Sequence, residues 1–291
     1  MSGELEVRYE RLLRWYPEHY RRERGAEMLG VLMDGAAADR RRPALRERLA
    51  LVVGGLRMRA GTYGQGTAWQ SWRAALRTAA LILVVLNVAD ATAGLGWHEQ
   101  GAIADIAKII LGALAAGAIL RDYFSVAVGA TVAMVAVEGF IVMDGSLIRI
   151  PVEPGVYTFA PGLVVVLLLP LVGRGPVRVT RSLNVLAALA LIPAGLWAIS
   201  PYSTDYANAF RASWWYLLAA AVLWAVVDER LALTLGLVLL YNVAYQVPLV
   251  WRALSYGEFG IWSLIAIAIA SIMPVIGVTA GAVVARRRAR V

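Results

Sequence analysis

Long apolar stretches constrain this chain more than any other feature. They recur from Ala79 onward, and each is long enough, at about 1.5 Å per residue, to cross most of a hydrocarbon layer about 30 Å thick. The chain is 60% hydrophobic and only 16% charged, whereas soluble domains average roughly 25% charged residues. The sequence therefore predicts an all-α fold, a polytopic membrane bundle of about eight transmembrane helices.

The predicted spans are separated by short polar or Gly/Pro-containing segments. They cover residues 79–96, 103–120, 123–143, 156–172, 183–200, 210–227, 231–251 and 261–285. The second and third spans are joined so tightly, at Arg121 and Asp122, that they could form one element, and seven spans is the alternative count. In the last span Gly277 and Gly281 form a GxxxG pattern, which favours close helix packing within the bundle.

Residues 1–60 differ from the rest because they hold 13 of the 27 arginines and 9 of the 20 acidic residues. No apolar run in them approaches the roughly 18 residues of a span, so a soluble head is expected, joined to the bundle (79–291, with a basic tail) by a linker and interfacial segment at 61–78. Pro17 and Pro43 suit the first turns of a second and a third helix. Helical spacing predicts three amphipathic helices in a small bundle, with the apolar residues Leu5, Tyr9, Leu12, Leu13 and Tyr16, then Leu29, Leu32, Met33 and Ala36, then Leu45, Leu49, Val52, Val53 and Leu56.

The arginines outside the head indicate the orientation of the bundle. With the head in the cytoplasm, eleven arginines fall in inner segments and three in outer loops, which agrees with the excess of positive charge on the cytoplasmic side of membrane proteins. Both termini are therefore expected in the cytoplasm and the protein in a cell membrane. The inner set is Arg73, Arg77, Arg121, Arg174, Arg178, Arg181, Arg230, Arg286, Arg287, Arg288 and Arg290, and the outer set is Arg149, Arg211 and Arg252.

Ionisable residues inside the spans are the candidates for a functional site, because each costs about 2.5–3.5 kcal/mol to insert at the middle of a helix. Asp105 and Lys108 are three residues apart and can pair on one helix face. The candidate residues of an outward-facing polar pocket are Asp90, Asp105, Lys108, Glu138, Asn242 and Gln246. Structural pairing, a sensory or ligand pocket, and an ion or proton pathway are all compatible with them, although a pathway is disfavoured because the cytoplasmic halves of the spans contain no acidic residue.

The sequence offers no catalytic motif. It has no Cys and only two His, which excludes thiolate chemistry and His-rich metal sites. Walker A and dinucleotide-binding glycine patterns are missing as well. We therefore expect no enzyme activity, no cofactor and no metal, and direct nucleic-acid binding is not expected either, since no folded reader or long basic arm is apparent.

One segment of the head resembles a known pattern. Residues 9–29 contain Leu-Leu-x-x-Tyr-Pro, an arginine-rich stretch, and then Gly-x-Glu-Met-Leu. This resembles the N-terminal HAAS-type signalling domain of bacterial, especially actinobacterial, integral membrane proteins, and the likeness is limited to about the first 60 residues. The family is associated with PadR-like transcription regulators, so the resemblance implies that the head binds a cytoplasmic protein. The matching residues, which it marks as the partner-binding part of the head, are Leu12, Leu13, Tyr16, Pro17, Gly25, Glu27, Met28 and Leu29.

These observations favour a non-enzymatic membrane protein of the bacterial cell membrane that acts as a sensor or anchor. Its partners would be the lipid bilayer and a cytoplasmic protein such as a PadR-like regulator. The alternative hypothesis is a small transporter, or an accessory subunit of one, that uses the outward-facing polar pocket.

Overall fold

The fold is all-α, as the sequence predicts. In the computed structural model the described residues form helices and the turns between them, with no strand in that part of the chain. They are residues 2–36, 40, 42–60, 68–95, 102–144, 159–173, 177, 179–199, 213, 216–239, 272, 275–284 and 287. The chain divides into two compact units: Met1–Gly66 with Val226–Asp228, called the head below, and Thr67–Ala225 with Glu229–Val291, called the helix bundle.

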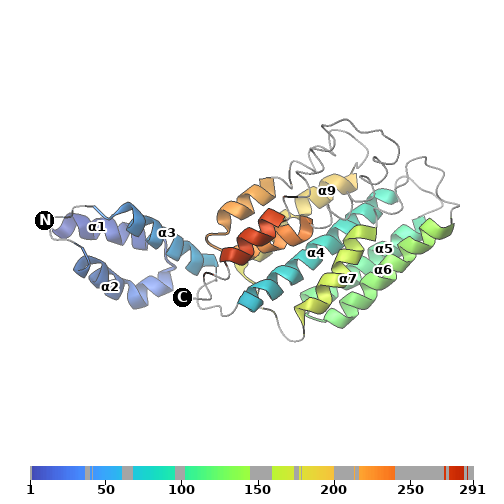
Figure 1. Ribbon diagram of the computed structural model, residues 1–291, viewed down its shortest axis with the longest axis horizontal. Coiled ribbons are helices and arrows are strands. Elements are labelled where there is room, and N and C mark those ends of the chain that lie inside the picture. The colour runs from blue at the N-terminus through green and yellow to red at the C-terminus, as the bar shows by residue number, and fades with distance from the viewer. Residues whose placement is uncertain are drawn as a thin grey trace. The chain divides into compact units, whose positions relative to one another are not determined.

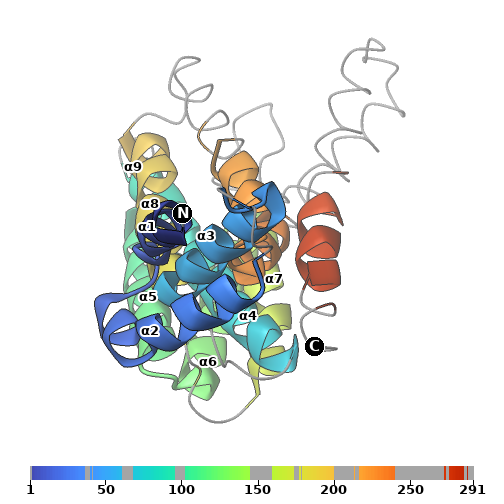
Figure 2. The same ribbon diagram turned by 90° about the vertical axis from the view of Figure 1, so that its left-hand side faces the viewer.

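The head consists of α1 (Ser2–Leu13), α2 (Glu18–Asp34) and α3 (Leu45–Ala60). α1 packs against both α2 and α3, which have at most marginal contact with each other (Figures 1 and 2). Pro17, with φ −56°, lies at the N-cap of α2, one position before the predicted first turn, where its missing N–H costs no hydrogen bond. The core of the head is small and comes from α1, the α1–α2 corner and α3: Leu5, Tyr9, Leu13, Tyr16 and Leu51.

Two adjacent glycines let α3 approach the corner between α1 and α2. A Cβ atom on Gly55 would lie 2.6 Å from the carbonyl carbon of Trp15 and 2.8 Å from its oxygen, and one on Gly54 would collide with the Tyr16 hydroxyl group. α3 therefore turns its glycine face toward the core. Its leucine-rich stripe lies on another face, so that Leu45 is 64% exposed and Leu49 57% exposed. Amphipathic spacing alone predicts the opposite orientation in a small bundle.

Four helices form a ring in the helix bundle. They are α4 (Ala68–Gly94), α5 (Ala102–Leu120), α6 (Phe124–Asp144) and α7 (Phe159–Val172). α4 and α6 each pack against both α5 and α7, and the four run side by side in Figure 1. α8 (Arg181–Leu189) and α9 (Leu191–Ile199) pack on α4 as well. α4 is thus the central helix, and it contributes more residues to the hydrophobic core than any other described helix.

Two of the predicted spans differ from the helices of the structure for identifiable reasons. α4 begins at Ala68, well before residue 79, because the polar residues of its first turns find partners inside the bundle, as described below. The predicted span 183–200 is divided into α8 and α9 at Ala190. Pro193 accounts for this break, because a proline removes the hydrogen bond to the carbonyl group four residues earlier, here that of Leu189.

The GxxxG pattern is used inside the bundle, as predicted. Residues 229–239 and 275–284 are helical. A Cβ atom on Gly277 would lie 3.1 Å from the Cα atom of Gly236, and one on Gly281 would lie 3.0 Å from the carbonyl oxygen of Glu229. The absence of side chains at these two positions allows the two backbones to pack closely.

Two helices among the described residues are long and apolar enough to cross a bilayer. They are Trp69–Gly94 and Ala102–Leu120, with mean hydropathies of 1.7 and 2.0. Shorter apolar helices cover Phe124–Gly139, Gly162–Val172, Arg181–Leu196 and Val275–Val284.

Candidate functional site

The polarity of α5 is reversed relative to a helix of a soluble protein. Asp105 and Lys108 are buried, together with the small residues Gly112 and Ala115 on the same face. The exposed positions are occupied by large apolar side chains, with Ile103 84% exposed, and Ile106, Ile110 and Leu114 also exposed. Water would favour the opposite arrangement, because burying a charge is costly and exposing a continuous apolar stripe is unfavourable.

The buried charges of α5 pair with each other and with α6. Lys108 Nζ lies 2.7 Å from Asp105 Oδ1 and 3.8 Å from Glu138 Oε1. All three side chains are buried. Asp90, on α4, is close enough to act electrostatically on Lys108. The structure therefore brings four of the six predicted pocket residues together, and we call Asp90, Asp105, Lys108 and Glu138 the charge cluster.

The position of the Asp105 carboxylate depends on a glycine of the neighbouring helix. A Cβ atom on Gly94 would lie 2.6 Å from Asp105 Oδ2, so any larger residue would displace the carboxylate. Gly94 ends α4, Asp105 lies in the first turn of α5, and Glu138 lies toward the end of α6. Three helix ends thus meet at the charge cluster.

The other two predicted pocket residues, Asn242 and Gln246, lie outside the described residues. In the part of the chain that is described, no three His, Cys, Asp or Glu side chains are grouped so that they could hold a metal ion. The charge cluster itself places an ammonium group among carboxylates. Such a group neutralises buried charge and can fix the relative positions of α4, α5 and α6.

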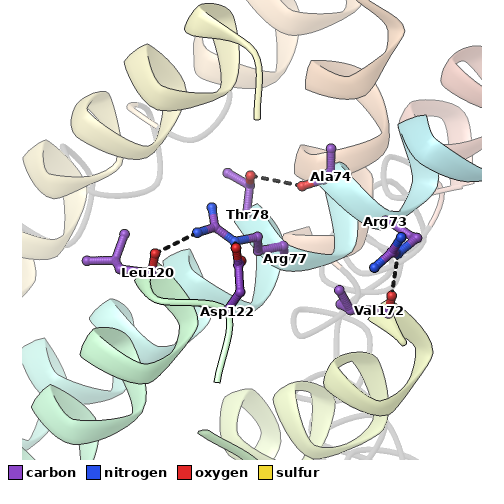
Figure 3. A network of polar contacts seen from close by, with 7 residues as sticks. All are labelled: Arg73, Ala74, Arg77, Thr78, Leu120, Asp122 and Val172. Carbon is purple, nitrogen blue, oxygen red and sulfur yellow. Dashed lines mark hydrogen bonds and ion pairs between the residues drawn. The ribbon is translucent and has the colours of Figure 1, made fainter. Parts of the chain in front are cut away.

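Arginines occupy the opposite end of α4 (Figure 3). Arg77 Nε lies 2.8 Å from Asp122 Oδ1, and Arg77 Nη2 donates a hydrogen bond of 3.0 Å to the carbonyl oxygen of Leu120. Arg73 donates to the carbonyl oxygen of Val172. Leu120 and Val172 are the last residues of α5 and α7, whose terminal carbonyl groups lack partners within their own helices. Two arginines one turn apart therefore cap two helices that both pack against α4, at helix C-termini where positive charge is favoured.

A second buried polar group at this end was not predicted from the sequence. The Ser71 hydroxyl group donates to Glu229 Oε1 at 2.9 Å and accepts from Arg230 Nε at 3.3 Å. Glu229 and Arg230 are buried at 6% and 2% exposure, although the sequence places both in a loop. The sequence feature that indicates this buried polar contact is the run of charged residues at 228–230, directly before an apolar stretch. The prediction that Glu229 lies in a loop is therefore wrong: Glu229 is helical and buried near the end of α4.

An apolar layer separates the two ends of α4. Between Arg77 and Asp90 this helix has no ionisable residue, over a length of about 20 Å at helical rise. The amide group of Asn87, which is buried in this layer, donates to the carbonyl oxygen of Leu83 in the same helix. The charge cluster and the arginine caps are therefore separate polar layers, and α4 does not link them by a chain of ionisable groups.

The head has its own polar network, which joins α1 to α3. The Tyr9 hydroxyl group donates to Glu47 Oε2 at 2.9 Å, Arg40 pairs with Glu47 Oε1 at 2.8 Å, and the Ala44 N–H group donates to Glu47 Oε2 at 3.0 Å. The hydrogen bond from Tyr9, followed by that from Ala44, lowers the pKa of Glu47. Burial, followed by the contact with Glu47, raises the pKa of Tyr9. Both effects favour the pair of neutral phenol and ionised carboxylate.

Acidification is expected to weaken the packing of α1 on α3. Because the pKa of Glu47 is lowered from 4.5, its contribution to stability is present above pH 4.5 and is lost as the pH falls through the lower value in the folded head. Hydrogen-exchange protection factors of α1 and α3 should therefore be higher in the wild type than in Glu47→Gln above pH 4.5, and the difference should vanish at lower pH. A difference that does not change with pH would contradict this role of the carboxylate.

Most of the residues in the head motif build the fold of the head. Leu13 and Tyr16 belong to its core, and Leu12, Met28 and Leu29 are partly buried against that core. Pro17 is half-buried where α2 begins, Gly25 is half-buried on α2, and Glu27 is exposed. The motif therefore explains the shape of the head more directly than it identifies a binding surface.

Comparisons with protein-family models, with curated proteins and with solved structures found no match to this chain. Its function is therefore inferred from the geometry described above and from the sequence.

Proposed function

We propose that this protein is a non-enzymatic integral membrane protein with about eight spans, whose cytoplasmic head binds a protein partner. In this proposal the helix bundle anchors the head and senses the state of the membrane or of the outer side. Both termini are cytoplasmic, so that the arginine caps lie at the inner end of α4 and the charge cluster at the outer end.

The reversed polarity of α5 is the observation that carries the membrane assignment. A helix that buries Asp105 and Lys108 and exposes Ile103, Ile110 and Leu114 is suited to a surrounding of lipid. The same pattern continues on α7, where Leu163, Leu167 and Leu171 are exposed at helical spacing. The apolar layer of about 20 Å between the two polar layers at the ends of α4 would cover most of a hydrocarbon core about 30 Å thick.

The pairing of the charges favours an anchor over a transporter. Lys108 is engaged by carboxylates of α5 and α6, and Arg77 by Asp122 and a helix end. A transport pathway needs groups that connect the two sides of the membrane, whereas the middle of α4 is apolar. The alternative role, a small transporter or accessory subunit, rests on the excess of carboxylates over ammonium groups in the charge cluster.

The incomplete burial of α2 and α3 supports binding of a partner by the head. α2 has no buried residue, although it is 17 residues long. The small core and the exposed apolar residues of α3 leave surface for another protein. The resemblance to HAAS-type signalling domains supports a cytoplasmic protein, such as a PadR-like regulator, as the partner.

The test compares the full chain with a variant lacking residues 1–60, each expressed in a bacterial host together with a PadR-like transcription regulator, called the regulator below. The full chain is expected to remain in the membrane after a carbonate wash and to be cross-linked to the regulator, whereas the variant remains in the membrane without it. Reconstituted vesicles are expected to show no solute flux. Release of the chain by carbonate, equal cross-linking of both chains, or a flux abolished by Glu138→Ala would each overturn the proposal.

A further inference from the structure

α3 carries an apolar stripe that does not contribute to the core of the head. Leu45, Leu49, Val52 and Leu56 are spaced by four, three and four residues, and at about 100° per residue they fall within a sector of roughly 60°. Leu45 and Leu49 are exposed, and Val52 and Leu56 are half-buried. Of the described residues, none of these four belongs to or packs on either hydrophobic cluster. We call these four residues the α3 stripe.

The head cannot turn the α3 stripe inward without losing other contacts. The opposite face of α3 holds Gly54 and Gly55 against the backbone and side chains of Trp15 and Tyr16. Leu51 is buried in the core on that side, and Glu47 is held by Tyr9. Rotation of α3 would place leucine side chains where only glycine fits. The exposure of the stripe is therefore a consequence of the way the head packs.

The width of the stripe indicates what kind of surface covers it. Spacing of four, three and four residues corresponds to the a and d positions of a heptad, which form the narrow seam between two paired helices. A helix that lies on a membrane has a wider apolar face, usually with aromatic residues. The α3 stripe contains no aromatic residue, so its composition and its heptad spacing favour another helix over a lipid surface.

The charges beside the stripe indicate the character of that helix. Arg46 and Arg48 lie at the two flanking positions, e and g, and both are exposed. The acidic residue between them, Glu47, is engaged by Tyr9 and Arg40. No flanking position of the stripe within α3 is acidic. A second copy of α3 would therefore offer no opposite charge, whereas a helix with acidic flanks would complement both arginines.

We infer that the α3 stripe is the docking site for an amphipathic helix with acidic flanks, contributed by a cytoplasmic protein. The inference rests on the proposed function, that the head binds a partner, and it names the surface and the chemistry of that partner. Leu45 and Leu49 supply the apolar anchors, and Arg46 and Arg48 select against basic helices.

The test uses the full chain in nanodiscs of zwitterionic phosphatidylcholine. The probe is a labelled synthetic peptide of three heptads with Leu at a and d and Glu at e and g, and a second peptide has Lys in place of Glu. Fluorescence anisotropy is expected to show saturable binding of the acidic peptide and binding at least about tenfold weaker for the basic one. The double change Leu45→Ser with Leu49→Ser should weaken binding of the acidic peptide about tenfold or more.

A charge reversal tests the role of the two arginines, and a control variant tests whether binding is specific to the α3 stripe. Arg46→Glu with Arg48→Glu should invert the preference, so that the basic peptide binds better. Val31→Ser, at a position of α2 that is 67% exposed, should leave both affinities unchanged. Since all these positions are on the surface, the head is expected to keep its fold, which the hydrogen-exchange pattern of α1 verifies.

Several outcomes would overturn the inference. They are equal binding of the acidic peptide by the wild type and the serine variant, a dimer of the full chain that the serine variant abolishes, and preferential attachment of the head to anionic lipid through Leu45 and Leu49. If the regulator is cross-linked equally well to the serine variant but not to the chain lacking residues 1–60, the inference fails while the proposed function stands. If the chain lacking residues 1–60 retains the regulator, the proposed function fails.

Discussion

Replacement of Lys108 by Met is expected to destabilise the helix bundle by about 3–5 kcal/mol, the usual cost of removing one partner from a buried ion pair. Lys108 is 8% exposed and lies between the carboxylates of Asp105 and Glu138. Met has a similar length, so packing is largely conserved, and the loss comes from carboxylates that no longer have a neighbouring ammonium group. The measurement is the fraction of folded protein across an SDS titration in mixed micelles.

Two further variants test whether the loss of stability comes from the buried charges of the cluster. Arg121→Met removes an exposed arginine from the turn after α5 and should change stability by no more than about 0.5 kcal/mol. The triple variant with Asp105→Asn, Lys108→Met and Glu138→Gln should recover much of the loss, because no buried charge of these three remains. If Lys108→Met unfolds at the wild-type SDS concentration, the charge cluster does not stabilise the bundle, and a role in binding or transport becomes the better explanation of its charges.

Replacement of Gly55 by Ala is expected to destabilise the head by about 1–3 kcal/mol, the usual range for overpacking. Alanine favours a helix over glycine by about 1 kcal/mol, so propensity alone predicts the opposite sign. The steric cost is expected to exceed this gain in helix propensity, because the new methyl group would lie 2.6 Å from the carbonyl carbon of Trp15, a backbone atom that cannot rotate away. Hydrogen-exchange protection of α1 and α3 in the full chain is the measurement.

Gly30 provides the matched control for this prediction. It lies within α2, four residues before the last residue of the helix, and a Cβ atom at that position would meet nothing within 4 Å. Gly30→Ala should therefore raise protection in the head, by up to about 1 kcal/mol. Equal effects of the two substitutions would show that the close approach of α3 to Trp15 is not required.

The sequence predicts those residues of the candidate site that are charged within an apolar run. Asp105 and Lys108 are charged residues within an apolar run, so their burial and their pairing at three residues apart follow from the cost of isolated charge. Their contact with Glu138 needed the arrangement of the helices, because Lys108 and Glu138 lie on different helices and no local spacing relates them. Ser71 and Glu229 could not be paired in advance for the same reason.

The sequence by itself determined the helical fold, the division into a charged head and an apolar bundle, and the identity of the costly buried charges. These properties follow from composition and periodicity, which act along the chain. The tertiary structure decided which face of each helix is covered. On α3 the leucine stripe is the more hydrophobic face, yet the glycine face packs inward, because Gly54 and Gly55 allow a backbone approach that leucine side chains would prevent. On α4, Arg73 and Arg77 donate hydrogen bonds to the last carbonyl groups of α7 and α5, which lie far away in the sequence. These hydrogen bonds form only when the helices pack together.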